Sequence, residues 1–158
     1  MKTSSAVIVA SLILACATWL AAADAAKDPA AKLIAGSNWQ GTHDHKGHAD
    51  PSSSSARLKV VKREAKTFTG EFYLNNPRTG RRGVKVAGEV DAKTGEVRMK
   101  PYEIISGTWG TGKDILEEVW TGTVKDDKLE FERKTKNGTW DVSLALKAKG
   151  DKDKDKDE

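Results

Sequence analysis

The stretch that decides the fold is residues 84–99, VKVAGEVDAKTGEVRM. From Val84 to Val90 every second residue is apolar or glycine, which is the pattern of a strand with one buried face. Residues 92–95, AKTG, then supply turn residues and end in a glycine, which tolerates a positive φ. The alternation resumes and continues to Met99, so the stretch predicts a β-hairpin.

Strand-length segments of the same kind follow one another through most of the chain. They are residues 37–43, 57–63, 67–74, the two strands of the hairpin, 116–124, 128–133 and 139–148. None of the sequence after the N-terminal apolar run keeps a 3.6-residue period over the length of a helix. Sequential strands with short turns favour an up-and-down antiparallel meander, which closes on itself to remove its edges. We therefore predict an all-β fold of about eight strands in a closed or nearly closed barrel, with a two-sheet β-sandwich as the alternative.

A repeated glycine favours the more strongly curved of these two folds. An apolar residue, any residue and a glycine recur in four predicted strands, as Trp39-Gln40-Gly41, Phe68-Thr69-Gly70, Val86-Ala87-Gly88 and Trp120-Thr121-Gly122. Each glycine falls on the inward face between apolar neighbours. Glycine inside a strand marks a sharp bend or a close approach, and small barrels need such positions to coil their strands.

Residues 1–23 are typical of a signal peptide for export. Lys2 is followed by an uncharged, largely apolar run over residues 6–20, and Ala21-Ala22-Ala23 offers small residues for cleavage before Asp24. The run is shorter than the roughly 20 residues that a membrane-spanning helix needs. The predicted mature protein is therefore secreted or periplasmic, without a membrane span. A lipoprotein signal ending at Cys16 is the alternative; Cys16 is the single cysteine, so no disulfide is expected after cleavage.

The rest of the chain divides into three predicted regions. Residues 24–35 form a flexible arm, residues 36–149 the barrel domain, and residues 150–158 a charged tail. The tail alternates Asp and Lys with no apolar residue, a composition that cannot repay the entropy of ordering. The full chain has a formal net charge of +4, and aromatic residues are not interleaved with its basic stretches, so no nucleic-acid partner is expected.

The start of the domain resembles the calycin group of lipocalins, fatty-acid-binding proteins and avidin-like proteins. The resemblance rests on Gly36-Ser37-Asn38-Trp39-Gln40-Gly41 at the first strand of a meander. The usual lipocalin signature is Gly-x-Trp, whereas two residues separate Gly36 from Trp39 here. The resemblance implies a small-molecule-binding barrel and a structural role for Trp39.

Six residues are candidate ligand contacts. Alternation points four aromatic side chains into the barrel and places a carboxylate on the same face near its mouth, while one further tryptophan lies in the glycine-rich residues 107–113. The six are Trp39, Phe72, Trp109, Glu118, Trp120 and Trp140. We expect a mostly filled base and a shallow cavity at the mouth beside Trp109, which is either exposed or folded over the opening.

The three histidines of the chain are a candidate metal site. His43, His45 and His48 lie within six residues, with Asp50 close behind. Neutral imidazoles bind Zn or Cu, and a carboxylate can complete the ligand set. The alternative is a polar loop, because Pro51 and a run of serines follow directly.

Basic residues suggest a second kind of partner, a polyanionic glycan. Four of them, Arg78, Arg81, Arg82 and Lys85, lie in or beside the predicted connection of residues 75–83. The alternative is a charged hairpin tip that prevents edge pairing. No nucleophile motif or phosphate-binding loop is present. We therefore predict a monomeric binding or envelope-associated protein without catalysis, a metal-binding protein as the alternative, and an enzyme of unknown class as the third possibility.

Overall fold

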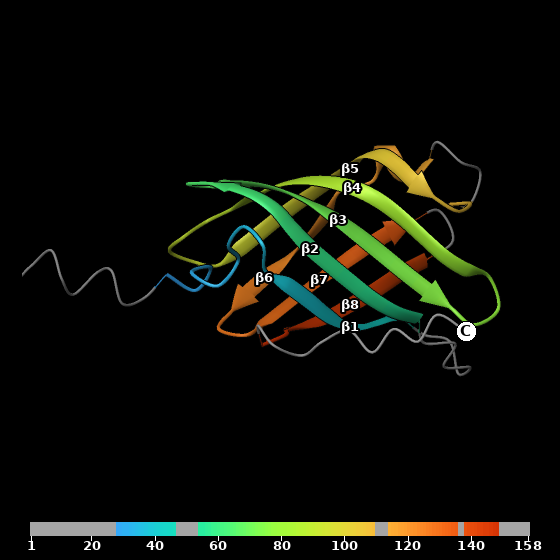
Figure 1. Ribbon diagram of the computed structural model, residues 1–158, viewed down its shortest axis with the longest axis horizontal. Coiled ribbons are helices and arrows are strands. Elements are labelled where there is room, and N and C mark those ends of the chain that lie inside the picture. Colours follow the sequence, from blue (N-terminus) through green and yellow to red (C-terminus); the bar gives the residue numbers. More distant parts are fainter. Residues whose placement is uncertain (1–27, 47–53, 110–113, 136–137, 149–158) are drawn as a thin grey trace, which may run out of the picture.

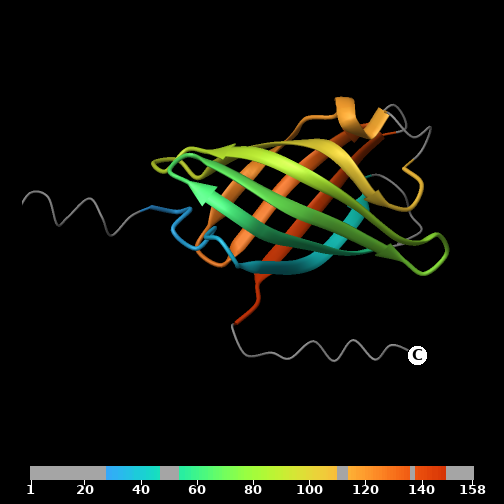
Figure 2. The ribbon, with the colours of Figure 1, turned by 45° about the horizontal axis from the view of Figure 1, so that its top comes forward.

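The computed structural model describes residues 28–46, 54–109, 114–135 and 138–148. Eight antiparallel strands in chain order form one closed barrel (Figures 1 and 2). They are β1 (Asn38–His45), β2 (Ser54–Glu64), β3 (Thr67–Asn76), β4 (Gly80–Val90), β5 (Glu96–Ser106), β6 (Trp120–Lys125), β7 (Lys128–Thr135) and β8 (Gly138–Leu146).

The barrel closes where the first strand meets the last. β1 pairs with β8 from Trp39 opposite Leu146 to His45 opposite Trp140. Every other strand pairs with its neighbours in sequence. The predicted closed meander is therefore confirmed, and the two-sheet sandwich is wrong.

The hairpin of residues 84–99 forms the fourth and fifth of the eight strands and is longer than predicted. β4 and β5 extend it back to Gly80 and on to Ser106. The turn is closed by Asp91, whose carboxylate accepts hydrogen bonds from the backbone N–H groups of Lys93 and Thr94. Gly95 has the positive φ, 75°, that the turn requires.

The predicted strand of residues 116–124 is wrong in its first half. A 3₁₀ helix, η2 (Asp114–Glu117), stands there instead, and β6 begins only at Trp120. β5 pairs with β6 only from Glu96 opposite Thr123 to Met99 opposite Trp120. η2 packs beside β5, so a turn of 3₁₀ helix stands where further β5–β6 pairing was expected. No helix in the described ranges is long and apolar enough to cross a bilayer.

Three of the four repeated glycines allow strands to approach one another closely, while Gly88 leaves room for the ring of Phe68. A Cβ atom on Gly41 would lie 1.8 Å from the carbonyl oxygen of Ser143, and one on Gly122 would lie 2.0 Å from that of Glu130. In both places the obstacle is the backbone of the next strand, which cannot move aside. The prediction of close approach at these inward positions is confirmed.

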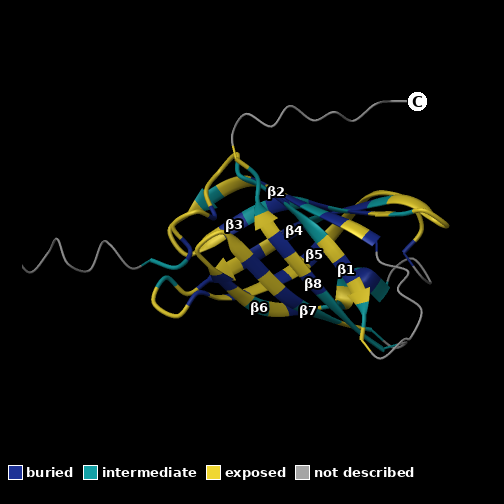
Figure 3. Cartoon of the chain, turned by 90° about the horizontal axis from the view of Figure 1, so that it is seen from below, coloured by how far each residue is buried: buried dark blue, intermediate teal, exposed yellow. Residues whose placement is uncertain are grey.

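Aromatic rings fill the middle of the barrel. Phe72 meets Trp120 edge-on with ring centroids 5.0 Å apart, and Trp120 stacks on Phe131 at 5.6 Å and 10°. Such contacts add about 0.5–1.5 kcal/mol each to the stability from burial. Along the strands, buried residues alternate with exposed ones (Figure 3).

One end of the barrel, here called the base, is closed by residues 28–37. Ala30 and Leu33 of this segment are buried with the core. The segment is tied to β2, because Gly36 N–H donates to the carbonyl of Val60 and Val60 N–H donates to that of Ser37. From residue 28 onward the predicted flexible arm is therefore a packed cover. In Figure 1 it lies, in blue, opposite the tip of the β3–β4 hairpin.

Candidate functional site

The opposite end of the barrel, here called the polar end, carries polar side chains on the inward face. The alternation of each strand continues past the apolar core by one more inward position. These positions hold His43 at the end of β1, Arg82 at the start of β4, Arg133 at the end of β7 and Trp140 at the start of β8. With Trp109 and Glu118 they form the group that we call the mouth cluster.

A buried ion pair is at the centre of the mouth cluster. The guanidinium of Arg133 donates to Glu118 through Nε at 2.5 Å and through Nη2 at 2.9 Å. The indole Nε1 of Trp120 donates to the same carboxylate at 2.9 Å. The side chains of Arg133 and Glu118 are only 13% and 11% exposed, so this bidentate ion pair is held firmly. Glu118 faces inward as predicted, but its role here is to neutralise Arg133.

Trp109 is folded over this end and is not exposed. Its ring is 2% exposed and lies within cation–π distance of two guanidinium groups. The Cζ atom of Arg133 is 5.4 Å from the ring centroid, and that of Arg82 is 5.8 Å away. Of the two predicted placements of Trp109, the structure therefore shows the buried one.

Arg82 has no carboxylate of its own. It donates to the carbonyl of Thr108 at 3.4 Å and to the hydroxyl of Thr79, and it makes no ion pair with any described residue. Burial, and then the charge of Arg133, lower the pKa of Arg82. The guanidinium remains charged. The predicted basic group is thus divided, because Arg81 and Arg82 are consecutive in a strand and face opposite sides of the wall.

His43 stacks on Trp140 inside the barrel. The two rings are 4.5 Å apart and nearly parallel, and His45 meets the same indole edge-on at 4.4 Å. Burial is the main cause that lowers the pKa of His43 to about 3, and the charges of Arg133 and Arg82 lower it further. The imidazole is therefore neutral at neutral pH.

The predicted metal site can be followed only in part. His43 and His45 lie together against Trp140, while His48 and Asp50 fall outside the described residues. Within the described ranges, no group of three His, Cys, Asp or Glu side chains is arranged to hold a metal ion. Zn or Cu binding by this loop stays a prediction.

Several buried polar atoms of the mouth cluster lack a hydrogen-bond partner among the described residues. They are Nε1 of Trp109, Nε of Arg82 and both ring nitrogens of His43. An unpaired buried donor costs about 1–3 kcal/mol, and folded proteins keep few of them. A group of such atoms around one charged cluster is the feature that needs an explanation.

The six predicted ligand contacts divide into two sets. Trp109, Glu118, Trp120 and Trp140 meet at the polar end. Trp39 lies at the base, where its indole N–H donates to Ser37, and Phe72 is enclosed in the aromatic core. Sequence reasoning named Arg82 only as part of the basic group and did not name Arg133. Extending the strand alternation beyond the last apolar residue would have placed both side chains inward.

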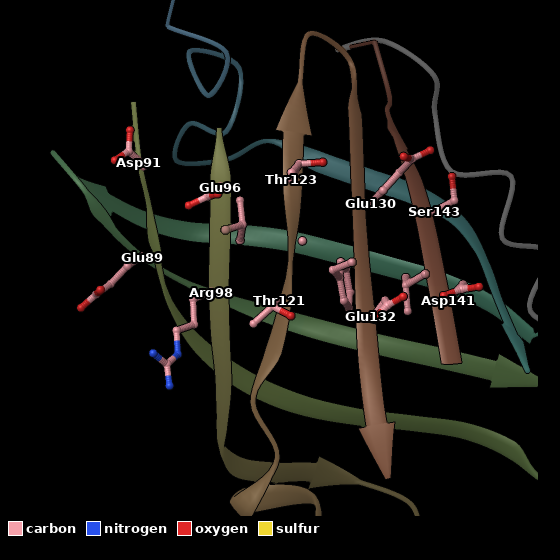
Figure 4. A pocket seen from close by; sticks show the side chains of 14 residues that line it. Glu89, Asp91, Glu96, Arg98, Thr121, Thr123, Glu130, Glu132, Asp141 and Ser143 are labelled. Carbon is pink, nitrogen blue, oxygen red and sulfur yellow. The ribbon is translucent and has the colours of Figure 1, made fainter. Parts of the chain in front are cut away.

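Three hollows of the described part of the protein lie on the outer wall, and the shallow cavity expected beside Trp109 stays a prediction. One of them, of about 760 Å³, crosses the strands from β4 to β8 (Figure 4). Six carboxylates and one arginine line it: Glu89, Asp91, Glu96, Glu130, Glu132, Asp141 and Arg98. Lys46 bridges Glu132 and Asp141, so part of this negative charge is already neutralised.

No protein-family model matches the chain, and no curated protein matches it. Among solved structures, a de novo designed fluorescence-activating β-barrel is similar, with a TM-score of 0.49 and 15% identity. The match covers 75% of this chain and 98% of the designed chain. A likeness this distant carries no argument about function, which has to be inferred from the residues themselves.

Proposed function

We propose that the protein binds a small organic anion with a flat apolar body at the polar end of the barrel. The observation that carries the proposal is the set of buried, unpaired polar atoms on Trp109, Arg82 and His43. An acceptor group on a ligand would satisfy the two N–H donors of Trp109 and Arg82, and so remove the cost of burying them unpaired.

The charge of the mouth cluster supports an anion. Glu118 neutralises Arg133, and His43 is neutral, so no described residue compensates the charge of Arg82. A partly buried guanidinium with no carboxylate partner attracts a carboxylate, sulfonate or phosphate group, to which it can donate two hydrogen bonds.

The apolar body is supported by indole rings at the polar end. Trp109, Trp120 and Trp140 lie around the charged groups. The ring of Trp120 is already packed against Phe72 and Phe131, so Trp109 and Trp140 are the indoles that would offer a flat, apolar surface to a ligand. Ligand sites in proteins have this composition, in which aromatic walls hold a few polar groups that fix orientation. The resemblance of Gly36–Gly41 to the calycin group agrees with such a role.

We also propose that the protein is exported and acts outside the cytoplasm, in the secreted, periplasmic or envelope fraction. The support is the sequence of residues 1–23, which lies outside the described part of the structure. N-terminal sequencing of the exported protein is expected to begin at Asp24. A mature chain that begins with a lipid-modified Cys16 would overturn this.

The binding proposal is tested with two probes that share one ring skeleton. 8-Anilino-1-naphthalenesulfonate carries a sulfonate, and N-phenyl-1-naphthylamine lacks it. We expect fluorescence titration to give at least tenfold tighter binding of the sulfonate. Arg82→Gln should remove most of that preference and leave the weaker binding of the neutral probe.

Arg98→Gln is the matched control, since it removes the same charge from an exposed residue on the outer face of β5. It should leave the affinity for the sulfonate within about twofold. Failure of the wild-type protein to bind either probe, or equal losses in the two variants, would exclude the proposed site.

Metal binding by the histidine loop is the second candidate. Its support is that His43 and His45 meet at one indole, and that His43 stays in the neutral form that binds metal. His45→Ala combined with His48→Ala should abolish Zn or Cu binding without changing the β-sheet circular dichroism. Equal metal affinity in the variant and the parent, or no binding by either, excludes this candidate.

A further inference from the structure

We infer that a second site, on the outer wall over β1 to β4, binds a sulfated or carboxylated sugar unit. The site is a hollow of about 580 Å³, here called the outer hollow. Its lining includes the side chains of Gln40, Ser55, Arg57, Tyr73, Asn75 and Arg81. All of them face away from the mouth cluster, so the inference is independent of the function proposed above.

Strand register makes these six side chains one continuous surface. Gln40 lies opposite Arg57, which lies opposite Tyr73, and this forms one row across β1, β2 and β3. Ser55 lies opposite Asn75, which lies opposite Arg81, and this forms the next row. Neighbours within a row are directly paired residues, whose Cβ atoms are about 4.5–5.5 Å apart in an antiparallel pair.

A missing side chain lets the tyrosine lie along the wall. Tyr73 is paired with Gly83, and a Cβ atom on Gly83 would lie 2.5 Å from Cε1 of the tyrosine ring. The ring therefore occupies the space above the glycine. The guanidinium of Arg81 lies over this ring, with Cζ 4.5 Å from its centroid. Tyr73 is thus the fixed centre of the outer hollow.

The outer hollow is positively charged. No carboxylate is among its lining residues, and Arg81 makes no ion pair within the described part of the chain. Burial and the nearby Glu71 raise the pKa of Tyr73, while the charges of Arg81 and Arg57 act in the opposite direction. Both guanidinium groups are therefore close to Tyr73, whose hydroxyl donates a hydrogen bond to Glu71.

The chemistry of the lining selects an anionic sugar. Arg81 suits a sulfate or carboxylate group, to which its guanidinium can donate a pair of parallel hydrogen bonds, and the guanidinium of Arg57, which donates to Oδ1 of Asn38 at 3.4 Å, adds positive charge beside it. The amides of Gln40 and Asn75 and the hydroxyl of Ser55 can donate to and accept from sugar hydroxyls. A tyrosine ring offers a flat surface for the apolar face of a pyranose. Single-stranded nucleic acid is disfavoured, because it stacks on several aromatic rings and this hollow has one.

The test is calorimetric titration with a heparin-derived hexasaccharide. We expect Arg57→Gln with Arg81→Gln to weaken binding at least tenfold. Lys125→Gln with Lys128→Gln removes the same charge from the exposed β6–β7 connection at the base, and should change the affinity no more than about twofold. Tyr73→Phe should bind like the wild type and Tyr73→Ala about fivefold more weakly, which separates ring contact from loss of the hydroxyl.

Three outcomes would overturn the inference. They are equal losses in the arginine and lysine pairs, competition by inorganic sulfate at the same concentration as the hexasaccharide, and equally tight binding of a single-stranded oligonucleotide. Arg82→Gln should leave hexasaccharide affinity unchanged, because its side chain lies inside the barrel. Thermal unfolding followed by circular dichroism checks that each variant is folded.

Discussion

The base and the polar end of this barrel are built from the same eight strands but are finished in different ways. At the base most inward positions stay apolar to the strand ends, and Ala30 and Leu33 close the opening. At the polar end the inward positions become charged or aromatic, and polar atoms of Trp109, Arg82 and His43 stay buried and unpaired. The packing of the base stabilises the fold, whereas the polar end keeps buried unpaired groups that lower stability, as binding sites do.

The largest expected effect is the difference in stability loss between truncating a tryptophan at the base and truncating one at the polar end. Trp39→Ala at the base is expected to lower the free energy of unfolding by about 3–5 kcal/mol, because it empties a fully buried aromatic site. Trp140→Ala at the polar end, where the ring is only partly buried, should cost about 1 kcal/mol. Urea unfolding measures both values. Equal costs would mean that the two ends contribute alike to the core.

The buried ion pair is the next largest expected effect. Glu118→Gln should cost about 3 kcal/mol, because it leaves Arg133 buried near Arg82 without a compensating carboxylate. Replacing both partners, as in Glu118→Leu with Arg133→Leu, should recover most of that loss. Thermal and urea unfolding of the single and double variants provide the comparison. A double variant less stable than the single one would show that the pair itself stabilises the fold.

The cover at the base is expected to contribute less than the core beneath it. Leu33→Ala should cost about 2–3 kcal/mol, near the lower end of the range for a buried leucine, since the segment can collapse onto the core. Ile34→Ala is the control on the adjacent, exposed side chain and should cost under about 0.5 kcal/mol. Comparable losses in both would contradict the packed cover.

The polar end should make stability sensitive to mild acid. The pKa of His43 is about 3 in the folded state and about 6.5 in the unfolded chain, so only the unfolded chain takes up this proton between these values. Stability should fall by about 2 kcal/mol between pH 7 and pH 5 on account of this residue. His43→Phe should remove that part of the pH dependence. A parent and variant with the same slope would show that His43 is not buried in its neutral form.

The sequence by itself determined the architecture and the faces of the strands. The alternation in residues 84–99 and the other strand segments predicted the antiparallel meander, and the inward glycines, such as Gly41 and Gly122, favoured its closure into a barrel and marked where strands touch. These are local properties, because a strand's period of two and a turn's glycine are contained within a few residues.

Tertiary structure alone decided which polar groups meet. Arg82, Glu118 and Arg133 come from β4, the segment before β6, and β7, and nothing local to any of them indicates the other two. β5 and β6 likewise pair over only a short stretch, and η2 forms where the sequence predicted more strand. Trp109 is buried over the opening of the barrel. Such outcomes depend on strand register and closure around the whole barrel, since each side chain's neighbours are far from it in sequence.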